Sequence, residues 1–206
     1  VSGTGIMIDD FQIINDVFIA PPENLAATVD GANVTLSWDA PGSGGGGGEE
    51  GWLTYSGENS DSIGTGAAAD FNVAAKWDAL GTENSIYPYV GMNITKIQFW
   101  PNEAASTYAV RVWAGSANTL VVDQPVTAPT IGAWNEITLT TPYTIPAATS
   151  IMAGFRCNTT TGYPAGIDAG PTVDGYGNWI NLGGWQTLTA ATDGDIQGNW
   201  NIKVYV

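Results

Sequence analysis

Carboxylates are the residues of this chain whose chemistry could support catalysis. The 206 residues include 20 Asp and Glu but no histidine, so the commonest general base and the usual zinc or copper ligand are missing. Hydrolysis of a glycosidic bond needs only two carboxyl groups. A carboxylate-dependent glycoside hydrolase is therefore the catalytic alternative, with Asp168 and Asp174 or Glu58 and Asp61 as its acid pairs. Acidic residues in Gly-rich loops more often form turns, and we expect no enzyme.

Acidic loops without histidine also match the preference of calcium for hard oxygen ligands. Four aspartates follow one another in Gly-rich sequence: Asp168, Asp174, Asp193 and Asp195. None of them fits the EF-hand pattern. The sequence thus leaves a structural calcium ion open as a cofactor and defines no ligand set for it.

Aromatic residues offer a binding chemistry instead of a catalytic one. The chain has nine tryptophans and eight tyrosines, and exposed flat rings stack on the apolar faces of sugars. The predicted ligand-binding residues are rings in loop-like sequence with two neighbouring acceptors: Tyr163, Tyr176, Trp179 and Trp185, with Asp168 and Asp174. The alternative is packing, because Trp179 and Trp185 flank a Gly183-Gly184 turn, where they can pack across a hairpin.

Composition excludes several partners. With 44% hydrophobic residues the chain can bury a core, while its net charge of −15 repels phosphate backbones. We therefore expect glycan or extracellular protein partners and no nucleic acid, and the low basic content disfavours anionic glycans. No apolar run is long enough for a transmembrane segment. The single cysteine, Cys157, lies in an apolar strand-like run and is expected to be buried.

A run of glycines divides the chain. Gly44 to Gly48 has a large backbone entropy to lose on ordering, so residues 42–50 are predicted to be a linker. Residues 1–20 are predicted to be the terminal strand of an upstream domain, and residues 21–41 to be a hairpin of two β runs around Asp30-Gly31. Residues 51–206 are predicted to be the main domain.

The main domain alternates strand and turn signals. Short strand-like runs such as Asp70–Trp77, Tyr108–Ala114 and Asn199–Val206 are separated by Gly, Pro and Asn, which predicts an all-β, antiparallel β-sandwich of jelly-roll type. The broken alternation in Asn93–Trp100 predicts a bulge. Strict alternation in Tyr108–Ala114 predicts that Val110 and Val112 are buried and that Trp113, on the opposite face, is covered at the rim or by a loop.

Several segments resemble known modules. "GIMIDDFQI" is similar to the last strand of cleaved-adhesin domains, and residues 21–41, with Trp38, resemble the first two strands of a fibronectin type III module. From Trp52 onward, "GMNITKIQFW", "YAVRVWAG", "AGIDAGP" and "NWNIKVYV" resemble a β-sandwich accessory domain of secreted, Bacteroidetes-type surface proteins. This resemblance implies a non-catalytic, adhesin-like domain that is secreted or at the cell surface and binds glycan or protein, or spaces its neighbours.

Overall fold

The computed structural model describes residues 23–31, 33–39 and 48–206. The chain divides into two compact units, Val1–Gly42 and Ser43–Val206, and each is described by itself. The predicted strand remnant at residues 1–20 and most of the predicted linker lie outside the described residues. The described end of that linker belongs to the second unit, where the Gly48 N–H donates to the Pro88 carbonyl at 2.8 Å.

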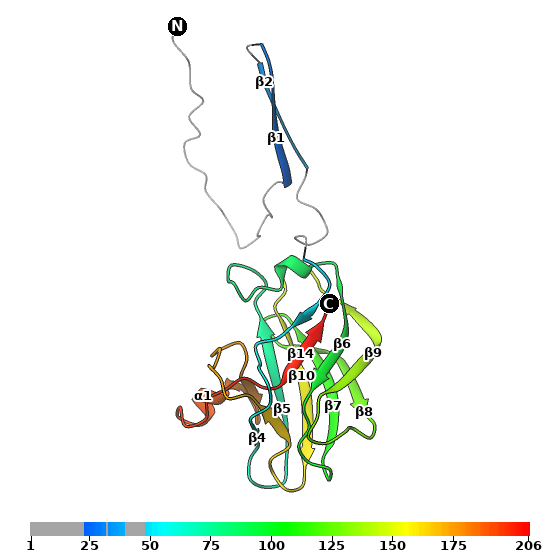
Figure 1. Cartoon of the computed structure of the whole chain (residues 1–206), viewed down its shortest axis with the longest axis vertical. Helices are drawn as coiled ribbons and strands as arrows, with labels where there is room; N and C mark the ends of the chain where they lie inside the picture. The colour runs from blue at the N-terminus through cyan, green and yellow to red at the C-terminus, as the bar shows by residue number, and fades with distance from the viewer. Residues whose placement is uncertain (1–22, 32, 40–47) are drawn as a thin grey trace. The chain divides into compact units, whose positions relative to one another are not determined.

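The first unit contains one antiparallel hairpin (Figure 1). Strand β1 (Glu23–Asp30) pairs with β2 (Asn33–Asp39), and Asp30 lies opposite Asn33. Gly31 has a φ of +61°, which glycine adopts without strain. The two predicted β runs around the Asp30-Gly31 turn are confirmed, while their relation to a fibronectin module stays a prediction.

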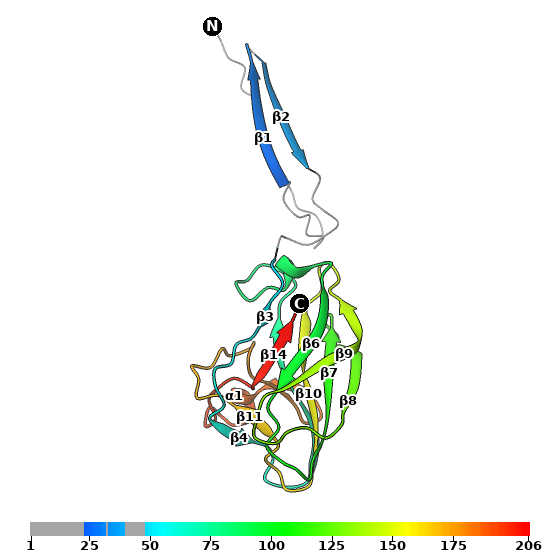
Figure 2. The same ribbon diagram turned by 45° about the vertical axis from the view of Figure 1, so that its right-hand side comes forward.

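The second unit is built from antiparallel strands in two larger sheets and one small one (Figures 1 and 2). The six-stranded sheet has the order β13 (Trp185–Thr187), β12 (Trp179–Asn181), β5 (Ala69–Trp77), β10 (Ile151–Thr159), β7 (Thr107–Ala114) and β8 (Thr119–Val126). The four-stranded sheet has the order β3 (Trp52–Leu53), β14 (Ile202–Tyr205), β6 (Asn93–Phe99) and β9 (Asn135–Thr144). Strands β11 (Ala165–Ile167) and β4 (Asp61–Ile63) form the small sheet, and the helices are η1 (Tyr87–Tyr89) and α1 (Leu188–Ala191).

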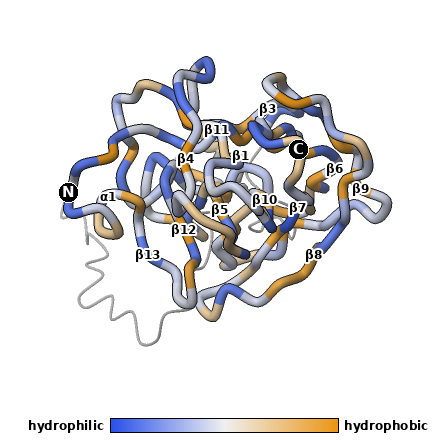
Figure 3. Tube along the Cα trace, turned by 90° about the horizontal axis from the view of Figure 1, so that it is seen from below, coloured by the Kyte–Doolittle hydropathy of each residue, from blue (hydrophilic) through white to orange (hydrophobic). Residues whose placement is uncertain are grey.

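The core lies between the two larger sheets. Alternate residues point inward from both of them, including Val73, Val110 and Phe155 on one side and Ile97 and Ile202 on the other. Hydrophobic and hydrophilic segments follow one another along the strands (Figure 3), as expected when strands bury one face. The all-β, antiparallel sandwich is confirmed, and the narrower jelly-roll assignment stays a prediction.

Local expectations can be compared with the strands. The predicted bulge is present, since the pairing of β6 with β9 shifts register between Ile94 and Lys96. Val110 and Val112 are fully buried, as predicted. Trp113 is covered on the opposite face, but by a cluster of strand residues that includes Met152 and Trp185 and not at the rim or by a loop. Cys157 is buried in the core, which raises the pKa of its thiol. No helix among residues 23–31, 33–39 and 48–206 is long and apolar enough to span a membrane.

Glu103 joins the loop before β7 to the loop between β10 and β11. Its carboxylate accepts hydrogen bonds from the Ser106 hydroxyl at 2.7 Å, from the Thr159 hydroxyl and from the Tyr163 backbone N–H. Burial by itself would raise the pKa of this carboxyl group, but the hydrogen bonds outweigh burial and lower the pKa to about 2. The folded state therefore favours ionised Glu103.

Acid should remove this contribution to stability. Because the folded pKa of about 2 lies below the ordinary value of 4.5, the contribution of Glu103 is full above that value and is lost as pH falls toward about 2. Glu103→Gln should lower the free energy of unfolding at neutral pH by about 1 to 3 kcal/mol and flatten its pH dependence in this window. Urea denaturation at a series of pH values measures both effects. Glu58→Gln, on an exposed side chain, is the control, and an unchanged pH dependence in the Glu103 variant would contradict the prediction.

Candidate functional site

The face of the six-stranded sheet that points away from the core carries a second apolar cluster. We call it the outer aromatic cluster, and its members are Ala74, Trp113, Met152, Trp179 and Trp185. The ring centroids of Trp113 and Trp185 lie 4.9 Å apart in an edge-to-face arrangement, a geometry that aromatic pairs prefer. Trp185 thereby helps to cover Trp113, which is only 5% exposed.

A cleft lies beside this cluster, where Trp179 forms part of its wall. Its volume is about 460 Å³. The lining combines one large ring and a few aliphatic groups with hydroxyl, amide and charged side chains from four separate segments: Lys76, Asp78, Ala79, Leu80, Ser116, Asn118, Ser150, Met152 and Trp179. Such a mixture of apolar wall and a few polar groups is typical of small-ligand sites.

Charged and phenolic groups are connected on one side of the cleft. The Lys76 ammonium contacts Asp78 Oδ1 at 2.8 Å, and the Tyr176 hydroxyl donates to Asp78 Oδ2 at 2.8 Å. Burial alone would raise the pKa of Asp78, but the hydrogen bonds from Lys76 and Tyr176 lower it. The Lys76 ammonium also lies 5.9 Å from the centre of the Trp179 ring, so this side of the cleft is an ion pair next to an aromatic face.

The loop before β12 positions Tyr176 and Trp179. The Trp179 indole N–H donates to the Gly175 carbonyl at 2.7 Å, and the Lys76 N–H donates to the Tyr176 carbonyl at 2.8 Å. Asp174 holds the same loop, because its carboxylate accepts a hydrogen bond from the Asn178 amide at 2.8 Å. This bond is the main reason that the pKa of Asp174 is lowered.

Asp168 is a buried residue that stabilises the loop before β12 through hydrogen bonds. The side chain is only 5% exposed, and its carboxylate accepts hydrogen bonds from the backbone N–H groups of Gly57, Gly170 and Asn199 and from the Asn199 amide. The same Asn199 amide donates to the Pro171 carbonyl and accepts from the Val173 N–H. Asp168 therefore stabilises the loop and does not line the cleft.

Tyr163 lies apart from the cleft lining. This residue is 53% exposed, and its hydroxyl lies close to Gly66. Of the predicted binding residues, only Trp179 lines the cleft. Tyr176 contacts the lining through its hydrogen bond to Asp78, and Trp185 lies in the adjacent cluster. Tyr163, Asp168 and Asp174 lie outside the lining.

Sequence reasoning did not name the remaining polar groups of the cleft. Lys76 and Asp78 come from the end of β5, Asn118 comes from the β7–β8 turn, and Ser150 precedes β10. Alternation in Asp70–Trp77 does indicate that Lys76 points outward. It does not indicate that the end of β5 lies beside the β7–β8 turn and the start of β10, because this depends on the strand order.

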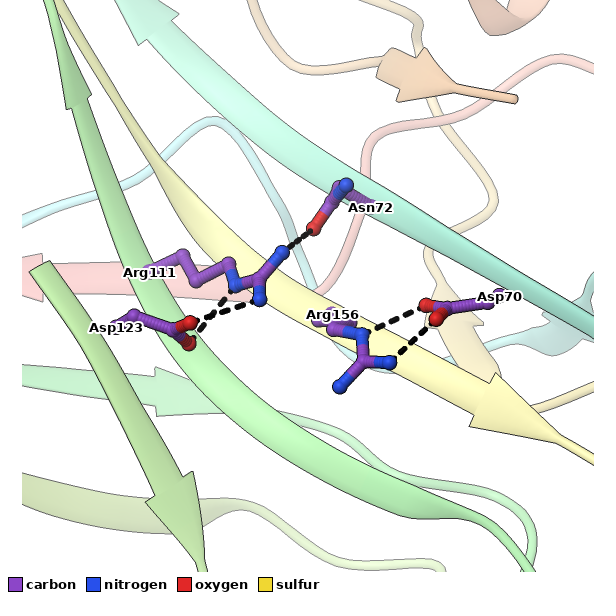
Figure 4. A network of polar contacts seen from close by, with 5 residues as sticks. All are labelled: Asp70, Asn72, Arg111, Asp123 and Arg156. Atoms are coloured by element: carbon purple, nitrogen blue, oxygen red, sulfur yellow. Dashed lines mark hydrogen bonds and ion pairs between the residues drawn. The ribbon is translucent and has the colours of Figure 1, made fainter. Parts of the chain in front are cut away.

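Two arginines on the same outer face are already paired (Figure 4). Arg111 donates to both carboxylate oxygens of Asp123 at 2.9 Å and to the Asn72 side-chain oxygen at 2.8 Å. Arg156 forms a bidentate pair with Asp70, and its hydrogen bonds lower the pKa of that carboxyl group. These contacts connect β5, β10, β7 and β8 and leave a polar surface with little net charge.

The acidic residues considered for catalysis or calcium are not gathered into a cluster. Within the described ranges, no three acidic, cysteine or histidine side chains form a group that could hold a metal ion. Asp61 is an exposed residue at the start of β4 whose carboxylate accepts a hydrogen bond from the Ser62 N–H. Glu58, Asp193 and Asp195 are also exposed. A structural calcium ion stays a prediction.

Comparisons of the chain with protein-family models, with curated proteins and with solved structures found no match. The resemblance to accessory domains of Bacteroidetes-type surface proteins therefore stays a prediction, and the site has to be interpreted from its own geometry.

Replacing Asp168 tests its role in supporting the loop. In Asp168→Asn an NH2 group replaces one of the two carboxylate oxygens, so the N–H donors that faced this oxygen lack an acceptor. The free energy of unfolding should therefore fall by about 1 to 3 kcal/mol. Urea denaturation measures this loss. Asp193→Asn is the matched control, since Asp193 is exposed with a φ of +50°, which asparagine tolerates. Equal stability of the two variants would contradict the assignment.

Proposed function

We propose that this chain is a non-catalytic carbohydrate-binding module of a secreted or cell-surface bacterial protein. The observation that carries the proposal is the wall of the outer-face cleft, where the Trp179 ring lies beside Lys76, Asp78 and Asn118. A sugar presents an apolar ring face surrounded by hydroxyl groups, and this wall offers it a stacking surface with adjacent hydrogen-bonding groups. The cleft volume of about 460 Å³ lies in the usual range for ligand sites.

The charges of the cleft favour a neutral glycan. Its lining contains one ammonium and one carboxylate, and these belong to the same ion pair, Lys76 with Asp78. A charged ligand group would have to displace one member of this pair. Hydroxyl groups can instead accept from Lys76 or donate to Asp78 without breaking the pair.

The glycoside hydrolase alternative has less support. Hydrolysis by paired acids places two carboxyl groups on either side of the scissile bond, whereas the described residues that line the cleft include one carboxylate, Asp78. Asp168, a member of a candidate acid pair, is buried and uses both oxygens to hold backbone and amide donors. Binding without bond cleavage fits this arrangement better.

Removing the ring of Trp179 should abolish glycan binding. We expect Trp179→Ala to weaken the affinity for a neutral oligosaccharide by more than tenfold, about 1.4 kcal/mol or greater, because the stacking surface is lost. The ligand is first selected by screening the whole chain against an array of neutral glycans, and calorimetry then measures the affinity. Asn118→Gly should also weaken binding, because it removes the amide from the cleft lining. The backbone should tolerate this change, since Asn118 has a φ of 48°, which glycine adopts without strain.

Tyr163→Ala is the matched control, because it removes an exposed ring that does not line the cleft. Circular dichroism and thermal melts must show that every variant is folded. If the array yields no ligand, or if Tyr163→Ala weakens binding as much as Trp179→Ala, the cleft is not the glycan site. The role would then be protein contact or spacing.

A further inference from the structure

The four-stranded sheet also has an outward face that is rich in aromatic and charged residues. Side chains at alternate positions of β14, β6 and β9 point away from the core, as the burial of Ile202, Val204 and Ile97 between them requires. We call this surface the lysine face. On the strands its members are Lys96, Gln98, Glu136, Lys203 and Tyr205, and it is extended by Trp52 of β3, next to Tyr205, and by the contacting pair Trp100 and Trp134.

The lysine face is a connected set of contacts. At one end, Trp52 packs edge-to-face on Tyr205 with ring centroids 5.2 Å apart, and the Lys96 ammonium lies 5.5 Å from the Tyr205 ring. At the other end, the Lys203 ammonium lies 4.2 Å from the centre of the Trp134 ring. An ammonium held over an aromatic ring face is attracted by the ring and is fixed in position.

Lys203 differs from the other basic residues of the chain. Of the five lysines and arginines, four form ion pairs with carboxylates: Lys76, Lys96, Arg111 and Arg156. Lys203 has no carboxylate partner in the part of the chain that the structure describes. Its positive charge is therefore available to a ligand.

A second positive charge lies close by. Lys203 of β14 is paired with Gln98 of β6, and Lys96 lies two residues before Gln98 on β6. Lys203 and Lys96 are therefore diagonal neighbours, whose backbones are roughly 7 to 8 Å apart. The Lys96 ammonium forms an ion pair with Glu136 Oε1 at 2.8 Å, and the two side chains are 37% and 42% exposed. The lysine face thus carries two cations and one carboxylate, in a chain whose net charge is −15.

We propose that the lysine face binds an acidic polysaccharide whose sugars carry carboxylate groups. Lys203 would pair with a sugar carboxylate, and Lys96 would donate to further oxygens, as would Gln98, whose amide also donates to Glu136 at 3.1 Å. Trp134 and Trp100 would contact the apolar parts of the sugar rings. This site is on the opposite sheet from the cleft and does not depend on it.

The net charge of the chain does not prevent such binding. At physiological ionic strength the Debye length is about 8 Å, so exposed charges farther away are largely screened and the local cations dominate. The excess of acidic residues over the rest of the surface should keep an anionic polysaccharide from binding elsewhere than on this face. A nucleic acid is a poorer match, because it carries about one charge per 1.7 Å of duplex, while the lysine face has a single unpaired cation.

Polygalacturonate and neutral dextran are the probes for this proposal. The whole chain should bind polygalacturonate at physiological ionic strength and lose affinity as salt is raised further. Any binding of dextran should depend neither on salt nor on Lys203. Lys203→Gln should weaken the binding of polygalacturonate roughly fivefold, as the loss of one exposed ion pair predicts. Lys203→Arg, which keeps the charge, should retain most of the affinity.

Arg156→Gln is the matched control, because it removes the same charge from the opposite sheet and should leave the affinity unchanged. Trp179→Ala should also leave it unchanged, so failure of the cleft and failure of the lysine face are distinguishable. The proposal is overturned if wild type does not bind polygalacturonate, or if Lys203→Gln and Arg156→Gln weaken binding equally. Binding of an oligonucleotide as tightly as polygalacturonate would overturn it as well.

Discussion

The buried carboxylate of Asp168 is the constraint on which the candidate site depends. A carboxylate that is removed from water without a cation is costly unless its oxygens receive hydrogen bonds, and here the donors come from Gly57, Gly170 and Asn199. These donors belong to three segments that are far apart in the sequence. The hydrogen bonds to this one carboxylate therefore fix the course of the loop that leads to Tyr176 and Trp179. They thereby also fix the position of Trp179 in the cleft wall.

The inner face of the six-stranded sheet is buried and its outer face is partly covered, and the cleft lies at one end of that outer face. The inner face packs on the four-stranded sheet, while the middle of the outer face is occupied by Trp113, Met152 and Trp185. Ion pairs of Arg111 and Arg156 occupy the other end (Figure 4). Trp179 is thus left at the border of the outer aromatic cluster, with one part packed and another part facing polar groups.

Sequence pattern predicted the properties that depend on neighbouring residues. Alternation in Tyr108–Ala114 separated the buried valines from Trp113, and an irregular period located the bulge in β6. The role of Asp168 was not predictable, because its hydrogen-bond donors lie up to 111 residues away. The pairing of Lys203 with the Trp134 ring depends on the register of β14, β6 and β9, and strand composition does not specify that register.

Chemical-shift mapping by NMR with a neutral oligosaccharide from the glycan screen tests most directly whether the outer-face cleft is the carbohydrate site. The largest changes should occur at the backbone amides of Lys76, Asn118 and Met152 and at the indole N–H of Trp179, whose resonance is assigned by comparison with a Trp179→Phe variant. Changes confined to residues of the lysine face, or spread over the loop around Tyr163, would contradict the assignment of the cleft.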